Sequence, residues 1–274
     1  MSVTQMSGKA RSSGAVSPSD LLALEVAATT RLLVMEDILD YSGHVAARIP
    51  GRDAFIIQIG STSRAEVTAA SMLVCDYDGN VIEGEGQPPS ELPIHLEIFR
   101  ARPDVQAVLH AHMELAIAFT MMAGVTILPM RARASRWKSG IPTHPDPSHI
   151  KLPEQGRELA QTLGPHHAAL MRAHGLVITA ESIQALFVDA VHFKENARAH
   201  MEVLQSGAKP LPLTGAEIEQ IERMEMRDWH IKKLWNYYIR KGMSDGVLPG
   251  DWTALIPSKD ALKRDRILDD RPRD

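Results

Sequence analysis

An apolar segment from Val105 to Leu109 leads directly into His110-Ala111-His112. Two residues at positions i and i+2 of a β-strand point to the same face, with side chains about 6 to 7 Å apart, so both imidazoles can reach one divalent ion. A third histidine, His174, lies far downstream. Three imidazoles with an open fourth position indicate a catalytic metal site, because structural zinc sites are closed and usually rich in thiolate. The pattern predicts a strand that carries metal ligands, and it makes an enzyme the leading hypothesis.

The composition restricts the partners of the chain. It has 274 residues, 44% hydrophobic and 23% charged, which is ordinary for a globular core. A net charge of -4 and a pI of about 6.3 favour neither nucleic acid nor an anionic membrane surface, so we expect a small neutral or anionic metabolite. The single cysteine, Cys75, excludes an internal disulfide and indicates the cytoplasm. The longest apolar stretch, Leu115 to Met130, is too short and too interrupted for a membrane span.

The first half of the chain reads as one helix followed by strands. Residues 1–16 are polar and predict a flexible tail, and Ser17-Pro18-Ser19-Asp20 is a strong helix start. An apolar stripe then continues to Leu39. Strands are expected within residues 41–50 and 54–59. Residues 72–76 and 81–82 form a predicted hairpin, because Asp78-Gly79 favours a tight turn.

The second half alternates helices and strands. Ser90 is predicted to cap a helix, a strand follows at residues 105–112, and two more strands flank His174 at residues 168–171 and 176–179. A helix is expected over residues 183–204, and Thr214 begins a capping box for one last long helix. We therefore predict one α/β catalytic domain over residues 17–250, followed by a charged extension at residues 251–274.

Taken in order, these segments resemble the class II aldolase/adducin family from about Leu21 to Met201. The matching segments are Ser42–Arg48 (SGHVAAR), Gly60-Ser61, Asp76–Gly84 (DYDGNVIEG), Pro89–His95 (PSELPIH), Arg102–His112 (RPDVQAVLHAH) and Arg172–Gly175 (RAHG). The resemblance implies a three-layer α/β/α subunit with a largely antiparallel central sheet. It also implies a homotetramer with active sites at subunit interfaces, in which His110, His112 and His174 bind a divalent metal and Glu91 is the catalytic acid/base.

The chemistry of these residues supports the resemblance. A metal with an open position stabilises an enolate-like oxygen, and a nearby carboxylate can move a proton to or from carbon. We expect one divalent ion per subunit, manganese or zinc, with iron or cobalt as alternatives, because imidazoles accept all four. Other interpretations exist for single residues: a histidine at a strand end is often only a hydrogen-bonded polar residue, and Glu91 would suit the dipole of a helix start.

Three positions differ from the sugar-phosphate aldolases of the family. Gly43-His44, Ser61-Thr62 and Pro89-Ser90 stand where those aldolases are expected to have Gly-Asn, Ser-Gly and Ser-Ser to hold phosphate. The differences favour a branch that decarboxylates ortho-hydroxylated aromatic dicarboxylates of the pyridine or benzene type. We therefore predict that His44, Ser61, Thr62 and Ser90 contact an aromatic acid, and that His44 grips a carboxylate or donates a hydrogen bond to the leaving group.

Two other functions stay open. A metal-dependent aldolase or epimerase acting on a sugar phosphate or another hydroxy-ketone would use the same metal and acid. A non-catalytic scaffold of the adducin kind would be expected to have lost metal ligands, whereas all are present here.

Among the remaining histidines, His95 is expected to pack behind the site. His144 and His149 lie in a proline-rich loop that either covers the site or faces solvent.

Overall fold

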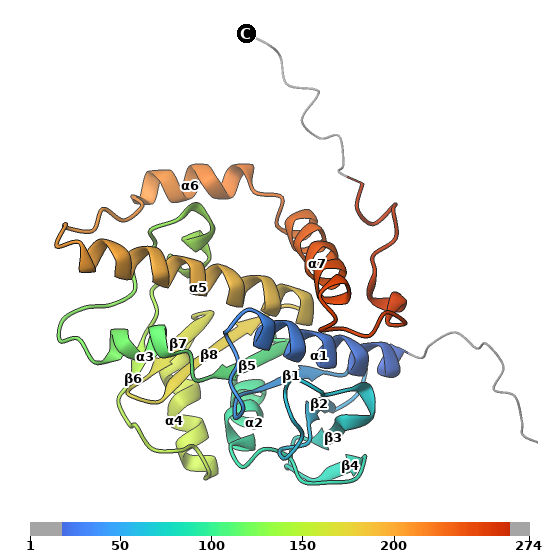
Figure 1. The fold of residues 1–274 in the computed structure, drawn as a ribbon. Coiled ribbons are helices and arrows are strands. Elements are labelled where there is room, and N and C mark those ends of the chain that lie inside the picture. Colours follow the sequence, from blue (N-terminus) through green and yellow to red (C-terminus); the bar gives the residue numbers. More distant parts are fainter. Residues whose placement is uncertain (1–17, 264–274) are drawn as a thin grey trace, which may run out of the picture.

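The computed structural model describes residues 18–263, which form a single eight-stranded sheet with helices on both faces (Figure 1). The strand order is β4-β3-β2-β1-β5-β8-β7-β6, and neighbouring strands are antiparallel except for β6 and β7. The strands are β1 (His44–Arg48), β2 (Ala54–Gln58), β3 (Met72–Asp76), β4 (Val81–Glu83), β5 (Ala107–Ala111), β6 (Thr143–His144), β7 (Ala168–Met171) and β8 (Gly175–Ala180).

The helices make two outer layers. Helices α2 and α4 pack together on one face of the sheet, and α1, α3 and α5 cover the other, with α7 packed on α1 and α5 (Figure 1). The predicted three-layer α/β/α sandwich with a largely antiparallel sheet is therefore confirmed. The helices are α1 (Pro18–Met35), α2 (Leu92–Ala101), α3 (Glu114–Thr120), α4 (Pro153–Leu163), α5 (Ile183–Gln205), α6 (Gly215–Met224) and α7 (Arg227–Ser244).

Alternation along the strands divides the core into two parts. Ile56 packs into the cluster beneath α1 and α5, whereas Phe55 and Ile57 pack against α2. The same period places Leu109 towards α1 and α5, so its neighbour His110 faces α2. The metal-ligand candidates therefore lie on the sheet face that α2 covers, at one end of the central strand β5.

Several predicted boundaries need correction. Glu91, not Ser90, occupies the cap position of α2, and it makes no capping hydrogen bond. The amide of Leu92 bonds to the carbonyl of Pro89, so Ser90 lies inside a turn that precedes the helix. The capping box at Thr214 is confirmed, but the single long helix predicted after it is wrong: the chain breaks after Met224 into α6 and α7.

The ends of the chain add two observations. The predicted tail, residues 1–16, lies outside the described residues. Within the predicted C-terminal extension, Leu255 is buried in the main core, and its carbonyl accepts a hydrogen bond from the indole of Trp235. No helix among residues 18–263 is both long and apolar enough to cross a membrane.

Candidate metal centre

The three predicted histidines and Glu91 converge at the end of β5. One potential ligand atom from each of these four residues lies within 4.8 Å of all the others. The Nε2 atoms of His110 and His112 are 3.1 Å apart, and the Nε2 atoms of His110 and His174 each lie 3.4 Å from an oxygen of Glu91. His110, His174 and Glu91 are buried, and His112 is half-buried. The prediction that β5 brings its two histidines together with a distant third matches this geometry.

Hydrogen bonds fix the orientation of each imidazole. The Nδ1 atom of His110 lies 3.1 Å from the carbonyl oxygen of Leu176, and that of His174 lies 3.2 Å from the carbonyl of Ser148. The Nδ1 atom of His112 lies 3.1 Å from a carboxylate oxygen of Asp40. Because every one of these partners accepts, each Nδ1 carries the hydrogen and each Nε2 presents a lone pair to the centre.

This arrangement fits a divalent metal. Two lone pairs facing each other at 3.1 Å repel unless a cation lies between them. Two nitrogens bound to one tetrahedral zinc at about 2.0 to 2.1 Å would be roughly 3.3 Å apart, close to the observed spacing. The Nε2 atom of His174 is buried and has no hydrogen-bond partner in the part of the chain that the structure describes, as expected for an atom that binds a ligand. Three imidazoles are a donor set that zinc and manganese both accept, and the carboxylate of Glu91 lies beside them.

Glu91 is ionised in this setting. Burial alone would raise the pKa of its carboxyl group, but its polar contacts, among them the backbone amide of Ile150, hold that pKa below its usual range. The amide of Ile150 donates to Oε1 at 2.9 Å. The carboxylate therefore starts as an acceptor that can take a proton, and it is aimed at the same point as the three histidines.

The segments packed against the end of β5 leave no room for a side chain at Gly43 or Gly175. A Cβ atom on Gly43 would lie 2.8 Å from the carbonyl oxygen of His110, and one on Gly175 would lie 2.4 Å from that of Ala111. Ala173 adopts a left-handed conformation with φ of +53°, which is uncommon outside glycine and asparagine. This tight turn directs His174 towards β5. The segment Arg172–Gly175 therefore supplies a metal ligand and also the backbone conformation that positions it.

His44 lies beside the cluster but beneath the surface. It pairs with His110 across β1 and β5, and the two ring centroids are 5.1 Å apart. Its Nδ1 atom lies 2.6 Å from Nε2 of His95, and both residues are buried, so His95 packs behind the site as expected. Burial, with the neighbouring His95 and His110, lowers the pKa of His44 well below its ordinary value. His44 is therefore neutral at neutral pH and suits the predicted role of hydrogen-bond donor better than that of a charged carboxylate grip.

The other predicted substrate contacts lie on two adjoining loops. Ser61 is exposed and Thr62 half-buried on the loop after β2, and Ser90 is exposed on the loop before α2. A Cβ atom on Gly60 would lie 3.0 Å from the carbonyl of Pro88, so the two loops touch. The structure thus brings together the two loops that carry these side chains.

Three features of the site are not evident from the sequence. Asp40 orients His112, and its other carboxylate oxygen accepts from the amides of Ser42 and Gly43. The loop of residues 148–150 supplies backbone groups to His174 and Glu91. Arg64 is buried against the loops on which the predicted substrate contacts lie. The only sequence signal for Asp40 is its place just before the Ser42-Gly43 turn, where an aspartate often bonds to the backbone that follows.

The two histidines of the proline-rich segment differ: His149 is both exposed and beside the site, whereas His144 neither faces solvent nor covers the site. His149 is largely exposed, yet its ring centroid lies 5.1 Å from that of His174 and its Nδ1 lies 3.5 Å from Glu91. It therefore stands at the edge of the metal centre. His144 is buried on β6, where it bonds to Thr162.

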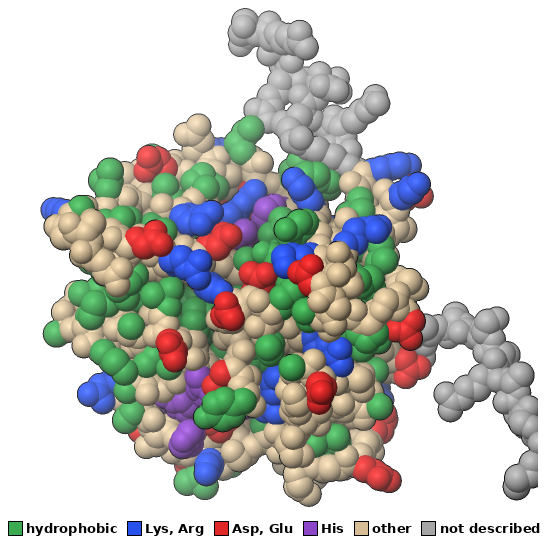
Figure 2. Space-filling view, in the orientation of Figure 1, with side chains coloured by type: hydrophobic (Ala, Val, Ile, Leu, Met, Phe, Trp, Pro, Cys, Tyr) green, Lys and Arg blue, Asp and Glu red, His purple; other side chains and the backbone are tan. Residues whose placement is uncertain are grey.

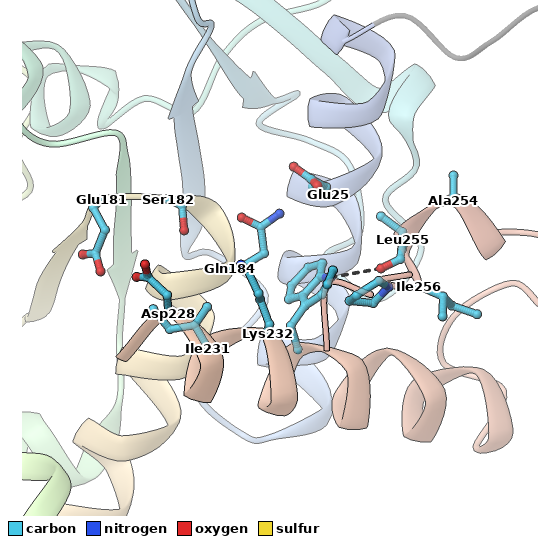
Figure 3. A pocket seen from close by; sticks show the side chains of 13 residues that line it. Glu25, Glu181, Ser182, Gln184, Asp228, Ile231, Lys232, Ala254, Leu255 and Ile256 are labelled. Atoms are coloured by element: carbon cyan, nitrogen blue, oxygen red, sulfur yellow. Dashed lines mark hydrogen bonds between the residues drawn. The ribbon is translucent and has the colours of Figure 1, made fainter. Parts of the chain in front are cut away.

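A cavity of about 460 Å³ lies elsewhere, between α1, α7 and the C-terminal segment (Figure 3). Glu25 and Gln184 face it together with the apolar rings and side chains of α7 and residues 254–257. Burial raises the pKa of Glu25 to about 7. The cavity holds none of the four clustered residues, so the metal centre rests on its donor geometry and not on the volume of a cavity.

Comparisons with known proteins agree with the site. The chain is 29% identical over 203 residues to 3,4-dihydroxyphthalate decarboxylase of Arthrobacter keyseri, covering 68% of this chain and 81% of that protein. It is 28% identical over 212 residues to the enzyme of the same name from Rhodococcus jostii (strain RHA1), covering 73% and 84%. The structure of an aldolase II superfamily protein from Pseudomonas syringae superposes with a TM-score of 0.74 at 23% identity, covering 85% of this chain and 96% of that one.

The family match covers the whole site. Residues 24–201 match the model described as the Class II Aldolase and Adducin N-terminal domain, and this range includes all four clustered residues. The predicted resemblance is therefore confirmed, as is the prediction of a carbon–carbon lyase, since the similar proteins are named as decarboxylases and aldolases. The chain belongs to the class II aldolase and adducin family.

Proposed function

We propose that the protein is a metal-dependent decarboxylase of an ortho-hydroxylated aromatic dicarboxylate of the dihydroxyphthalate type. The observation that carries the proposal is the carboxyl group of Glu91 beside three imidazoles whose Nε2 atoms face one point. A divalent ion held by His110, His112 and His174 would stabilise negative charge on the hydroxyl oxygen of the substrate. Glu91 is the proposed acid/base.

The reaction moves one proton from oxygen to carbon. Glu91 accepts the proton of the ortho-hydroxyl group and delivers it to the ring carbon that bears the carboxylate. The bond between that carbon and the carboxylate then breaks, carbon dioxide leaves, and the electron pair restores the aromatic ring as a phenolate. Atoms and charge balance without an oxidant or reductant, so a single carboxylate that is alternately base and acid suffices.

The loops beside the cluster support an aromatic acid as substrate. His44, Ser61, Thr62 and Ser90 are proposed to contact it, with neutral His44 donating a hydrogen bond. The similarity to two 3,4-dihydroxyphthalate decarboxylases, each covered over most of its length, supports the same substrate class. His149, exposed at the edge of the cluster, is positioned to meet a substrate as it enters.

The test is a substrate panel. The purified protein, loaded in turn with zinc and manganese, is given dihydroxyphthalates, hydroxypyridine dicarboxylates and sugar phosphates, while carbon dioxide and aldehyde are both measured. Carbon dioxide from at least one aromatic dicarboxylate is expected. Aldehyde from a sugar phosphate without carbon dioxide from the aromatic acids would replace the proposal with an aldolase, which the same metal cluster could serve.

We propose further that the subunits form a homotetramer with the metal centre near an interface. The half-buried His112, the exposed His149 and the exposed Tyr41, next to Asp40, leave one side of the cluster open to a neighbouring subunit. Light scattering coupled to size exclusion gives the mass of the assembly directly. A monomer with full activity would contradict this part of the proposal.

A further inference from the structure

Arg64 is a buried arginine that holds two site loops together. Only 5% of the residue is exposed. Its Nη1 atom donates to the carbonyls of Gly60 and Thr62 at 2.8 and 2.6 Å, within the loop after β2. Its Nε and Nη2 atoms donate to the carbonyls of Gly43 and Ser42 at 2.8 and 3.1 Å, in the loop before β1. One planar guanidinium thus spans both segments with directional bonds.

The same loops are connected to the metal centre. Asp40 binds the amides of Ser42 and Gly43 through one oxygen and the imidazole of His112 through the other. The 42–43 segment is therefore fixed on one side by a residue that orients a metal ligand and on the other by Arg64. As a result, the position of Ser61 and Thr62 relative to the metal ligands depends on the guanidinium.

Among residues 18–263, no acidic side chain contacts the guanidinium of Arg64. All four of its hydrogen bonds go to backbone carbonyl oxygens, and within the described residues Asp40 acts on it only from a distance. A buried charge is costly unless something compensates it, and carbonyl dipoles do so only in part. An anionic ligand above the loops would complete the compensation.

We propose, building on the proposed function, that Arg64 is the positioning residue that holds the substrate loops and gives them their preference for an aromatic dicarboxylate. The guanidinium does not touch the substrate. It acts by fixing the loop of residues 60–62 next to the metal centre and by placing a positive field beneath that loop. A neutral molecule of the same shape would benefit from the fixed loop but would not be attracted by the positive field.

The experiment measures binding of two unreactive probes to the zinc-loaded protein by isothermal titration calorimetry. Phthalate is the dianionic probe, and phthalamide is its neutral counterpart. Arg64→Gln removes the charge and is expected to weaken phthalate binding by about tenfold or more and phthalamide binding by only about two- to threefold. Equal weakening of both probes, or no weakening of phthalate binding, would overturn the proposal. So would a wild-type protein that binds phthalamide as tightly as phthalate.

Two further variants make the result specific. Arg31 is the matched control, because its partly buried guanidinium also donates to backbone carbonyls, those of Val67 and Val247, away from the cluster. Arg31→Gln should leave the affinity ratio of the two probes unchanged. If Arg64→Gln does not fold, Arg64→Lys carries the test, because it keeps the charge and loses the planar fork. Both probes should then weaken by a similar factor, about threefold or more, with zinc content unchanged, and unaltered binding of both would contradict the proposal.

The two proposals fail in different ways. Neither probe is turned over, so a wild-type protein that prefers phthalate but releases no carbon dioxide from the panel would contradict the proposed function alone. Carbon dioxide release by the wild type, with unchanged phthalate affinity in Arg64→Gln, would contradict the role of Arg64 alone.

Discussion

Two pairs of histidines in this protein face each other through their Nε2 atoms, and only one of them has the surroundings of a metal site. The Nε2 atoms are 3.1 Å apart in His110–His112 and 3.0 Å apart in His192–His230. By distance alone the pairs are equivalent. Histidine side chains also reach the surface in two separate places in Figure 2, the upper of them beside Lys and Arg side chains.

The difference lies in what surrounds each pair. His110 and His112 have acceptors on both Nδ1 atoms, a third imidazole and a carboxylate. At the second pair, burial and then Arg133, His192 and two further cations lower the pKa of His230 to about 4. These cations disfavour further positive charge at His230, and among the described residues no third ligand group completes a cluster with the pair, so we interpret it as an ordinary hydrogen bond. A metal centre is therefore recognised by the acceptors behind the ligands and by the sign of the local charge.

The largest effect should be loss of the metal. His110→Ala or His112→Ala removes a ligand from the cluster and should lower metal affinity by orders of magnitude while the fold persists. His192→Ala, in the second pair, should keep one ion per subunit. Elemental analysis after dialysis, with circular dichroism as the check on folding, decides the matter. Full metal content in both ligand variants would exclude this cluster as the binding site.

Glu91 is the feature that the second pair lacks at its centre, because Glu195 bonds instead to Nδ1 of His192. Glu91→Gln should lower turnover by about 10²- to 10⁴-fold, the usual contribution of a positioned acid or base. Metal content and substrate affinity should change little. Steady-state kinetics on the substrate found in the panel measures this, and a raised KM with unchanged kcat would mark Glu91 as a binding residue.

A variant of Asp40 tests the role of the hydrogen-bond acceptor that orients the metal ligand His112. Asp40→Asn keeps the size of the side chain but removes the negative charge next to His112, and metal affinity should fall by about 10- to 100-fold. Competition with a coloured chelator gives the affinity. The matched variant is Glu195→Gln, which removes the acid next to His192 and should leave metal affinity unchanged.

His44→Asn tests the residue next to the cluster that differs from the aldolases. Loss of the imidazole should lower decarboxylation by about tenfold or more, roughly 1.4 kcal/mol of transition-state stabilisation, without loss of metal. His95→Asn is the informative companion, because it removes the partner of His44 but not His44 itself. Full activity in His44→Asn would show that the ring only fills space between β1 and α2.

Local patterns predicted much of the fold and failed where structure depends on distant contacts. The strands around Phe55 and Leu109 were predictable because apolar residues concentrate there. Helix α3 has only seven residues inside an apolar stretch and was not predicted. Helix α4 was also missed, although Leu159, Ala160 and Leu163 give it a buried face at helical spacing, because the rest of the helix is polar. The break between α6 and α7 follows Met224 without a proline or glycine, and a sequence pattern gives no warning of it.

The residues of the site also differ in how far the sequence predicts them. His110 and His112 were predictable because a period of two along an extended segment is a local property, although β5 ends at Ala111, one residue before the predicted end of the strand. Asp40 lies 72 residues from the histidine that it orients, and only the pairing of β1 with β5 brings the two segments together. Arg64 resembles an ordinary surface arginine in the sequence, because nothing local shows that its neighbours bury it. Ligands can thus be predicted from spacing, whereas the residues that orient them require the fold.

The smallest expected effect concerns the stability of the second pair. The pKa of His230 is about 4 in the folded protein, against about 6.5 in an unfolded chain. Between these values the unfolded state binds a proton that the folded state does not, so stability falls as the pH drops from about 6.5 towards 4. His230→Gln removes this contribution and should flatten the dependence of Tm on pH in that window by about 1 to 3 °C, because the ring is only partly buried and solvent screens it. The measurement is best made in a His112→Ala background, in which release of the metal at low pH no longer contributes to Tm. Parallel curves for the two proteins would mean that His230 takes up its proton equally in the folded and unfolded states, and the contrast between the two histidine pairs would then lose its electrostatic basis.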